Sequence, residues 1–179
     1  MATATGTNGG ERPGTGERPG ELAAIDLGSN SFHLVLGRDA GGEVRILDRV
    51  KERVSLAEGL VERGTITPEA RARALSALAR FGQRLRGLDA ARVRAVGTNT
   101  FRAADDGEAF LAEASAALGY PIEVVSGTEE ARLVYAGVRF TSGFYKRRIL
   151  CVDIGGGSTE LALGKGRDPR LVESVRMGH

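Results

Sequence analysis

The alternation of apolar and polar positions predicts a three-stranded meander near the N-terminus. Residues 21–28, 31–38 and 43–54 form short apolar runs, and turn-forming residues separate them. Gly41 and Gly42 mark the second of these turns. We therefore expect three consecutive strands of one sheet.

Longer segments, with apolar residues at helical spacing, alternate with short strands after this meander. Thr67 is a suitable N-cap for the first helix, and Pro68 fits its first helical position. Gly119 closes the second helix, and the third begins near Ser126. The expected helices are residues 67–88, 105–119 and 128–140, and the expected intervening strands are residues 91–98 and 121–127.

The chain then returns to a meander, and its first turn repeats the first turn of the chain. Three strands are expected over residues 147–157, 158–166 and 170–178. The stretch "IDLGSNSFHL" (residues 25–34) aligns without a gap with "VDIGGGSTEL" (residues 152–161). This internal repeat indicates that a second copy of the same structural unit begins here.

Alternating strands and helices favour an α/β fold with a mixed sheet. We expect a mixed five-stranded sheet with flanking helices over residues 21–139. The opening three-stranded meander of a second such domain, cut short, should occupy residues 140–179. Residues 1–20 are rich in Gly, Pro and Thr and carry an approximate "GERPG" repeat, so we expect a disordered tail there.

The two related turns suit the binding of phosphate. A strand, an aspartate and a tight Gly/Ser turn direct several backbone N–H groups into one concavity, and glycines let an anion approach the backbone. Asp26 and Asp153, at the ends of the two strands, can hold Mg²⁺ or orient a water molecule. Two such turns facing each other would clamp a polyphosphate. A purely structural glycine turn with a capping aspartate is the alternative for either turn alone. The donors that the side chains add are the hydroxyls of Ser29, Ser31, Ser158 and Thr159.

Composition narrows the class of protein further. The formal net charge of +2 over 179 residues is too weakly basic to indicate specific nucleic-acid binding. No apolar run approaches the roughly 20 residues that a membrane helix needs, and the N-terminus lacks the apolar region of a secretory signal. Cys151 is the only cysteine, which excludes an internal disulfide. We expect a cytoplasmic protein with no membrane partner.

Four stretches together resemble one known family. "AIDLGSNSFHLVL", "GTNTFRAA", "PIEVVSGTEEARLVYAGV" and "CVDIGGGSTELALG" are similar to motifs of the exopolyphosphatase and guanosine pentaphosphatase (Ppx/GppA) family. The resemblance extends from Leu22 to His179 and implies an actin-like (ribonuclease H-like) fold. It also implies an active site between two such domains.

The resemblance implies roles for particular residues. Glu130 matches a proposed catalytic base, and Arg102 matches a phosphate-contacting arginine. Asp153, with Asp26 as its counterpart, matches a carboxylate near the metal, and Glu160 a second metal contact. The two phosphate loops match Gly28, Ser29, Asn30 and Ser31, and Gly155, Gly156, Gly157, Ser158 and Thr159.

The residues themselves leave alternatives open. Glu130 lies in the first turn of a predicted helix, where the helix dipole should keep the carboxylate ionised. Glu129 fits a capping box with Ser126. Arg102 can also be read as an ordinary surface arginine, and His33 as a structural histidine.

We expect hydrolysis of the terminal phosphate of inorganic polyphosphate, with Mg²⁺ as cofactor. Guanosine pentaphosphate is the alternative substrate, and a non-catalytic nucleotide- or alarmone-binding module or an actin-like kinase are alternatives of other classes. The full-length protein is expected to form a homodimer. Because the second domain is expected to be partial, its sheet should be poorly covered and the activity of this chain low or absent.

Overall fold

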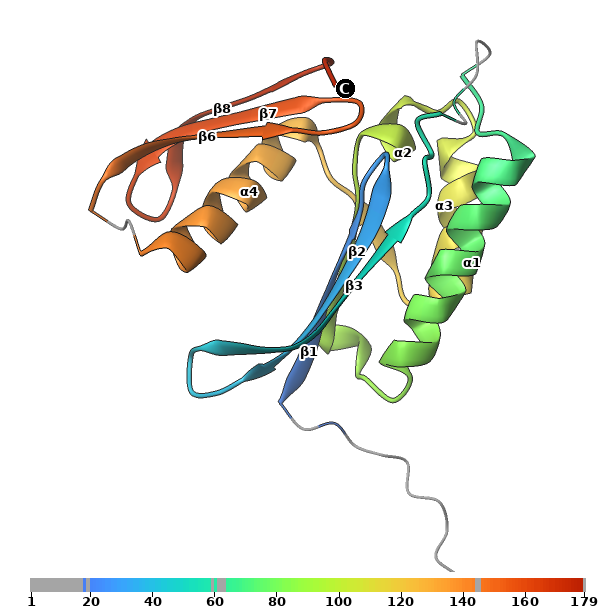
Figure 1. The fold of residues 1–179 in the computed structure, drawn as a ribbon, viewed down its shortest axis with the longest axis horizontal. Helices are drawn as coiled ribbons and strands as arrows, with labels where there is room; N and C mark the ends of the chain where they lie inside the picture. The colour runs from blue at the N-terminus through green and yellow to red at the C-terminus, as the bar shows by residue number, and fades with distance from the viewer. Residues whose placement is uncertain (1–17, 19, 59, 61–63, 144–145, 179) are drawn as a thin grey trace, which may run out of the picture.

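The structure is a computed structural model that describes residues 18, 20–58, 60, 64–143 and 146–178. The expected disordered tail over residues 1–20 lies almost entirely outside the described residues. Within the described part, the chain forms two sheets and four α-helices (Figure 1).

The first sheet has five strands in the order β3-β2-β1-β4-β5. Its first three strands pair antiparallel, whereas β4 and β5 extend the sheet in parallel, so the sheet is mixed as predicted. Parallel pairing requires crossover connections, and the helices after β3 and β4 supply them. The strands are β1 (Glu21–Leu27), β2 (Ser31–Asp39), β3 (Val44–Arg53), β4 (Val93–Gly97) and β5 (Ile122–Val124).

Helices α1 (Pro68–Leu85) and α3 (Gly107–Leu118) cover one face of the first sheet (Figure 1). The hydroxyl of Thr67 accepts a hydrogen bond from the backbone N–H of Ala70, which confirms the predicted cap. Gly119 closes α3 in the left-handed conformation that glycine favours. The main core lies between these helices and the sheet, and its fully buried side chains include Ile25, Leu27, Phe32, Phe81 and Phe110.

Two short helical segments were not expected from the sequence. A 3₁₀ turn (Ala90–Arg92) precedes β4, and the five-residue helix α2 (Asn99–Ala103) follows β4. Phe101 of α2 stacks on Phe110 of α3 with a centroid separation of 5.2 Å. This contact fixes α2 against the core, so that Arg102 on α2 is held beside the end of the sheet.

Helix α4 (Gly127–Ser142) packs on the second sheet, which consists of β6 (Arg148–Ile154), β7 (Thr159–Lys165) and β8 (Pro169–Val175) in that order. Ala131 and Tyr135 of α4 form a small core with Cys151 and Ala162. The domain boundary expected at residue 139 therefore falls near the C-terminal end of α4, which packs against the second sheet.

The other face of the second sheet carries exposed apolar side chains. Leu150, Val152 and Ile154 alternate along β6 on the side opposite Cys151, and they are 60%, 53% and 64% exposed. The expectation of a poorly covered second sheet thus holds for this face, while α4 covers the other.

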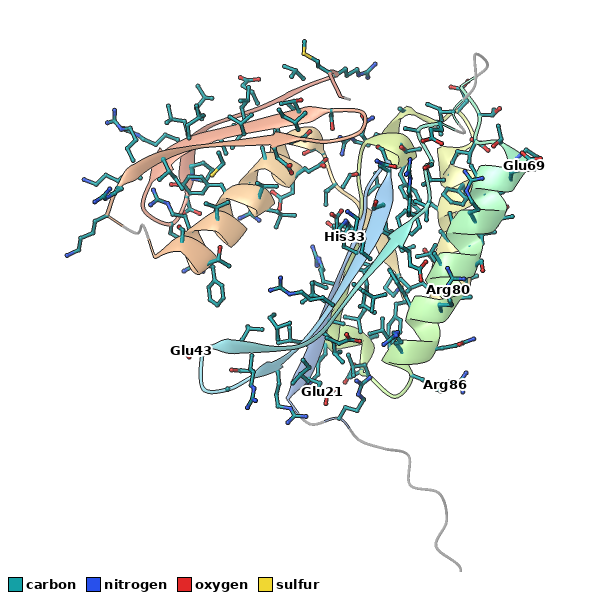
Figure 2. The ribbon with its side chains drawn as sticks, viewed as in Figure 1. Glu21, His33, Glu43, Glu69, Arg80 and Arg86 are labelled. Carbon is teal, nitrogen blue, oxygen red and sulfur yellow. The ribbon has the colours of Figure 1, made fainter. Side chains whose placement is uncertain are left out.

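The second sheet and α4 lie on the opposite side of the first sheet from α1 and α3 (Figure 1). Figure 2 shows His33 on that same side, away from α1 and its exposed Arg80. The chain crosses between the two halves after β5, through Val125 and Ser126. No helix in the described part of the chain is both long and apolar enough to cross a membrane.

Two helical glycines provide a matched test of the packing. A Cβ atom added at Gly82 of α1 would overlap the backbone carbonyl of Leu118, whereas one added at Gly137 of α4 would meet nothing within 4 Å. We expect Gly82→Ala to lower the free energy of unfolding by about 1–3 kcal/mol through overpacking. Gly137→Ala should raise it by up to about 1 kcal/mol, because alanine is the better helix former. Urea unfolding of both variants checks this, and equal effects would contradict the close approach of α1 and α3.

Candidate functional site

The two related turns have the same local geometry. A Cβ atom added at Gly28 would lie 3.1 Å from the carbonyl oxygen of Ser31, and one added at Gly155 would lie 3.1 Å from that of Ser158. At the second turn, the N–H of Gly155 donates to that same carbonyl at 2.9 Å. The sequence repeat is therefore also a structural repeat.

The two turns face each other across one cleft. The position of a Cβ atom on Gly156 lies 3.5 Å from the Cβ atoms of both Ser29 and Asn30, so the turns nearly touch. A side chain at Gly157 would overlap the amide of Asn99. The cleft has a volume of about 330 Å³. Eight of the nine predicted phosphate-loop residues line it, namely Gly28, Ser29, Asn30, Ser31, Gly155, Gly156, Gly157 and Ser158.

Thr159, the ninth residue, points elsewhere. Its hydroxyl donates to the backbone carbonyl of Met177 at 2.6 Å, and it does not line the cleft.

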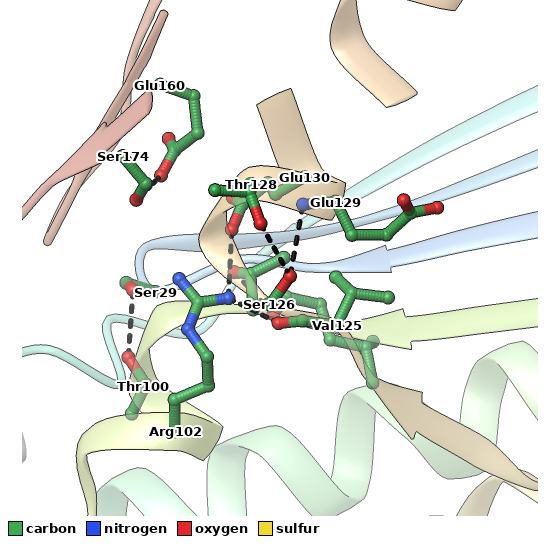
Figure 3. Close-up of polar contacts among 12 residues, drawn as sticks. Ser29, Thr100, Arg102, Val125, Ser126, Thr128, Glu129, Glu130, Glu160 and Ser174 are labelled. Atoms are coloured by element: carbon green, nitrogen blue, oxygen red, sulfur yellow. Dashed lines mark hydrogen bonds and ion pairs between the residues drawn. The ribbon is translucent and has the colours of Figure 1, made fainter. Parts of the chain in front are cut away.

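The first turn is held by its own contacts, because the hydroxyl of Thr100 donates to the Ser29 hydroxyl at 2.8 Å (Figure 3). The carbonyl of Asn30 also accepts from the N–H groups of Val54 and Ser55.

Asp26 and Asp153 lie in this cleft, one from each sheet. The surrounding protein shields Asp26 from bulk water and raises the pKa of its carboxyl group. His33 lowers this pKa, and the negative charge of Asp153 raises it again. The negative charge of Asp153 therefore acts on Asp26 across the cleft.

His33 and Lys51 also line the cleft, although no motif in the sequence assigned them to it. Asp26 of β1 is paired with His33 of β2, and His33 with Lys51 of β3, so the three form a row on one face of the sheet. The alternation of side chains along a strand says only that His33 lies on one of the two faces of the sheet. The pairing register is needed to show that this is the same face as that of Asp26.

Glu130 and Arg102 form an ion pair at the junction of the two halves. The Nη1 atom of Arg102 donates to Glu130 at 3.1 Å and to the carbonyl of Val125 at 2.7 Å (Figure 3). The side chains are 24% and 18% exposed, so neither is an ordinary surface residue. The helix α2 carries Arg102, and the first turn of α4 carries Glu130.

The pKa of Glu130 is raised to about 7, mainly because the side chain is buried and also because of the negative charge of Glu160. The hydrogen bond and charge of Arg102 lower this pKa, and Asp26 raises it slightly further. The expectation that the helix dipole would keep Glu130 readily ionised was wrong, because loss of solvation outweighs it. A carboxyl group that titrates near pH 7 is suited to accept a proton.

The neighbouring Glu129 has a structural role. The hydroxyl of Ser126 accepts a hydrogen bond from the N–H of Glu129 at 3.1 Å, which is one half of the predicted capping box. The Glu129 carboxylate binds Arg132 instead of completing the box, and this pairing lowers its pKa. The pKa values of the two adjacent glutamates are thus shifted in opposite directions.

Glu160 is buried and does not line the cleft. Its carboxylate accepts a hydrogen bond from Ser174 at 2.8 Å (Figure 3). It pairs across the strands with Asp153 on the face that packs against α4. Its effect on the site is electrostatic, through the pKa of Glu130.

The donor set of the cleft fits a hard divalent cation with few protein ligands. Among the described residues, no group of three or more His, Cys, Asp or Glu side chains is arranged to hold a metal. Mg²⁺ commonly takes only one or two carboxylates and completes its shell with water and substrate phosphates. Asp26 and Asp153, whose charges repel across the cleft, match that requirement.

Comparison with known proteins agrees with these features. The sequence model of the Ppx/GppA phosphatase family matches residues 34–179. A relative from Haemophilus influenzae is 46% identical over 158 residues, which cover 88% of this chain and 49% of the relative. A Vibrio vulnificus relative, named guanosine-5'-triphosphate,3'-diphosphate pyrophosphatase, is 46% identical over 156 residues, covering 87% of this chain and 31% of the relative.

A solved structure gives the same result for the fold. The crystal structure of an exopolyphosphatase from Cytophaga hutchinsonii superposes with a TM-score of 0.81 at 30% sequence identity. The match covers 88% of this chain and 51% of that one. The chain belongs to the Ppx/GppA phosphatase family, and the predicted actin-like α/β fold is confirmed. It spans about half the length of the Haemophilus influenzae relative.

The shifted pKa of Glu130 leads to a direct test by carboxyl-carbon NMR. We expect the Glu130 side chain to titrate near pH 7, and Asp26→Asn to lower that midpoint by removing a nearby negative charge. Because the folded-state pKa lies above the unfolded one, stability should fall as pH rises from about 4.5 to 7. Glu129→Gln is the matched control and should leave the Glu130 midpoint unchanged. A midpoint near 4.5 would contradict the proposed burial.

Proposed function

We propose that this chain carries the phosphate-binding and water-activating groups of a phosphoanhydride hydrolase. The main support is the position of Glu130, whose pKa is about 7 and which lines the cleft formed by the two matching glycine turns. The substrate is inorganic polyphosphate, from which the terminal phosphate is released. Guanosine pentaphosphate is the second candidate, because the Vibrio vulnificus relative is named for that class of nucleotide.

The proposed reaction begins with binding of the terminal phosphoryl group between the two turns. The turns offer backbone N–H groups, and their glycines leave no side chain between the phosphate and the backbone. Glu130 then removes a proton from the attacking water, which its near-neutral pKa allows. The water oxygen bonds to the terminal phosphorus as the anhydride P–O bond breaks, and the shortened polyphosphate leaves with the electron pair of that bond. Arg102 holds Glu130 in place and offers positive charge to the phosphoryl oxygens.

Asp26 and Asp153 are the residues that we propose to hold Mg²⁺. Bound there, the ion would neutralise phosphate charge and supply Lewis-acid stabilisation. Lys51, which shares the cleft with Asp26 and His33, adds positive charge there. We further propose a cytoplasmic location, which fits the buried, unpaired thiol of Cys151. The homodimer of the full-length protein stays a prediction.

The function is tested by measuring phosphate release and ligand binding on the same samples. With polyphosphate and Mg²⁺, Glu130→Gln should reduce phosphate release about 100-fold or more, because the general base is lost. Binding of polyphosphate, followed by calorimetry, should change much less. Glu129→Gln is the matched control and should release phosphate as the unmodified chain does. Running guanosine pentaphosphate in parallel distinguishes the two substrates.

The same assay decides between catalysis and binding alone. A chain that binds polyphosphate but releases no phosphate would favour the non-catalytic binding module. Phosphate release that survives Glu130→Gln would contradict the role of Glu130 as the base. Transfer of phosphate to a sugar or acetate would favour a kinase instead.

The metal site has its own test. Asp153→Asn should weaken Mn²⁺ binding, measured by water proton relaxation with Mn²⁺ in place of Mg²⁺, because one of two carboxylates is lost. Asp168→Asn removes the same charge in the exposed turn between β7 and β8 and should leave metal binding unchanged. Equal metal affinity in all three proteins would contradict the assignment. Chelation of the metal should abolish phosphate release.

A further inference from the structure

The second glycine turn needs support from outside itself. Gly155, Gly156 and Gly157 are consecutive, and glycine loses more backbone freedom on ordering than any other residue. Backbone N–H groups bind an anion best when they are held in place beforehand, because the ligand then does not have to order them. A contact that fixes this turn before phosphate arrives would therefore strengthen binding.

The short segment that follows β8 makes such a contact. A Cβ atom added at Gly178 would lie 2.5 Å from the carbonyl carbon of Gly156 and 2.5 Å from the nitrogen of Gly157, so a side chain there would displace the turn. Neither Met177 nor Gly178 is among the residues that line the cleft. The segment thus touches the turn without occupying the site. Figure 1 shows the chain beyond β8 beside the turn between β6 and β7.

Thr159 holds this segment in place. Its hydroxyl donates to the carbonyl of Met177 at 2.6 Å. The N–H of Met177 donates to the carbonyl of Val175 at 2.8 Å, so the chain turns tightly after β8. These two bonds fix the residue that precedes Gly178. Although Thr159 points away from the cleft, it is therefore connected to the glycine turn through this segment.

The first glycine turn is supported from the corresponding place. After β3, the N–H groups of Val54 and Ser55 both donate to the carbonyl of Asn30, at 3.0 and 2.9 Å. Ser55 has a φ of 49°, and in the described part of the chain it is the only residue other than glycine with a positive φ. A serine in this left-handed conformation is strained. The contact with Asn30 is thus maintained against backbone strain.

The strand registers make the two supports equivalent. In the internal repeat, Phe32 aligns with Thr159. Phe32 pairs with Glu52 of β3, and Thr159 pairs with Val175 of β8. The supporting residues lie two and three positions after these partners in both halves. In each half, therefore, the chain that leaves the third strand supports the glycine turn of that half.

We propose that Thr159 and Gly178 are positioning residues, which hold the second glycine turn in its phosphate-binding conformation through the segment after β8. Gly156 is then held from two sides, by the first turn and by Gly178. Neither positioning residue touches the substrate. This inference rests on the proposed function, and it gives Thr159 a role other than direct contact with phosphate.

The first test compares Thr159→Val, which removes the hydroxyl, with Thr159→Ser, which keeps it, in the whole chain. In Thr159→Val without ligand, ¹⁵N relaxation should give order parameters for the N–H groups of Gly156 and Gly157 below about 0.85, the value of rigid backbone. Calorimetry with Mg²⁺ present should show inorganic polyphosphate binding about two- to tenfold more weakly, as expected for one lost hydrogen bond. Thr159→Ser should restore both. Thr141→Val, which removes a hydroxyl that donates to the carbonyl of Gly137, is the matched control and should change neither.

The second test acts on the segment itself. Gly178→Ala should weaken polyphosphate binding by at least the same factor, because the added Cβ would displace the backbone of Gly156 and Gly157. At Gly137 an added Cβ would meet nothing within 4 Å. Gly137→Ala is therefore the matched control and should bind polyphosphate as the unmodified chain does.

The outcomes separate positioning from two simpler roles. If Thr159→Val binds more weakly while the turn stays rigid, the inference is wrong, because Thr159 would then contact phosphate directly. If the turn loosens while the affinity stays unchanged, or if Gly178→Ala binds normally, the segment has only a structural role and the inference is also overturned. Failure of the unmodified chain to bind polyphosphate would instead overturn the proposed function. The relaxation data alone would then decide whether Thr159 and Gly178 hold the turn.

Discussion

The close approach of two glycine turns is the constraint on which the rest of the site depends. Gly156 lies directly against the first turn, because a Cβ atom there would be in ordinary van der Waals contact with Ser29 and Asn30. This contact brings the ends of two separate sheets together. It places Asp26 and Asp153 in one cleft, where their charges interact. A single turn of this kind would be an ordinary strand connection, whereas the pair encloses a site.

The two halves repeat more than their turns. In the first sheet, Asp26 and His33 lie side by side on neighbouring strands, and in the second sheet Asp153 and Glu160 occupy the matching positions. The repeat therefore preserves the aspartate and replaces a histidine by a glutamate. That replacement has a consequence, because the buried charge of Glu160 helps to raise the pKa of Glu130. A residue of the second sheet thus raises the pKa of Glu130, which lies in the helix that precedes this sheet.

Helix α4 contacts both halves of the structure. Its N-terminal turn carries Glu130 toward the first sheet, and its body packs against the second through Ala131 and Tyr135. Gly127 allows this turn to lie directly against β8. The position of Glu130 is therefore set by contacts with both halves. The apolar face of β6, with Leu150, Val152 and Ile154, takes no part in these contacts.

The sequence by itself determined the order of the main elements, the helix caps at Thr67 and Ser126, and the repeat that contains both aspartates. These features depend on local periodicity and on residues close in the chain, so they can be recognised without a structure. Only the tertiary structure decided the pKa of Glu130, the place of Lys51, and the turning away of Thr159 and Glu160 from the cleft. Burial and strand register depend on residues distant in sequence, and no local pattern encodes them.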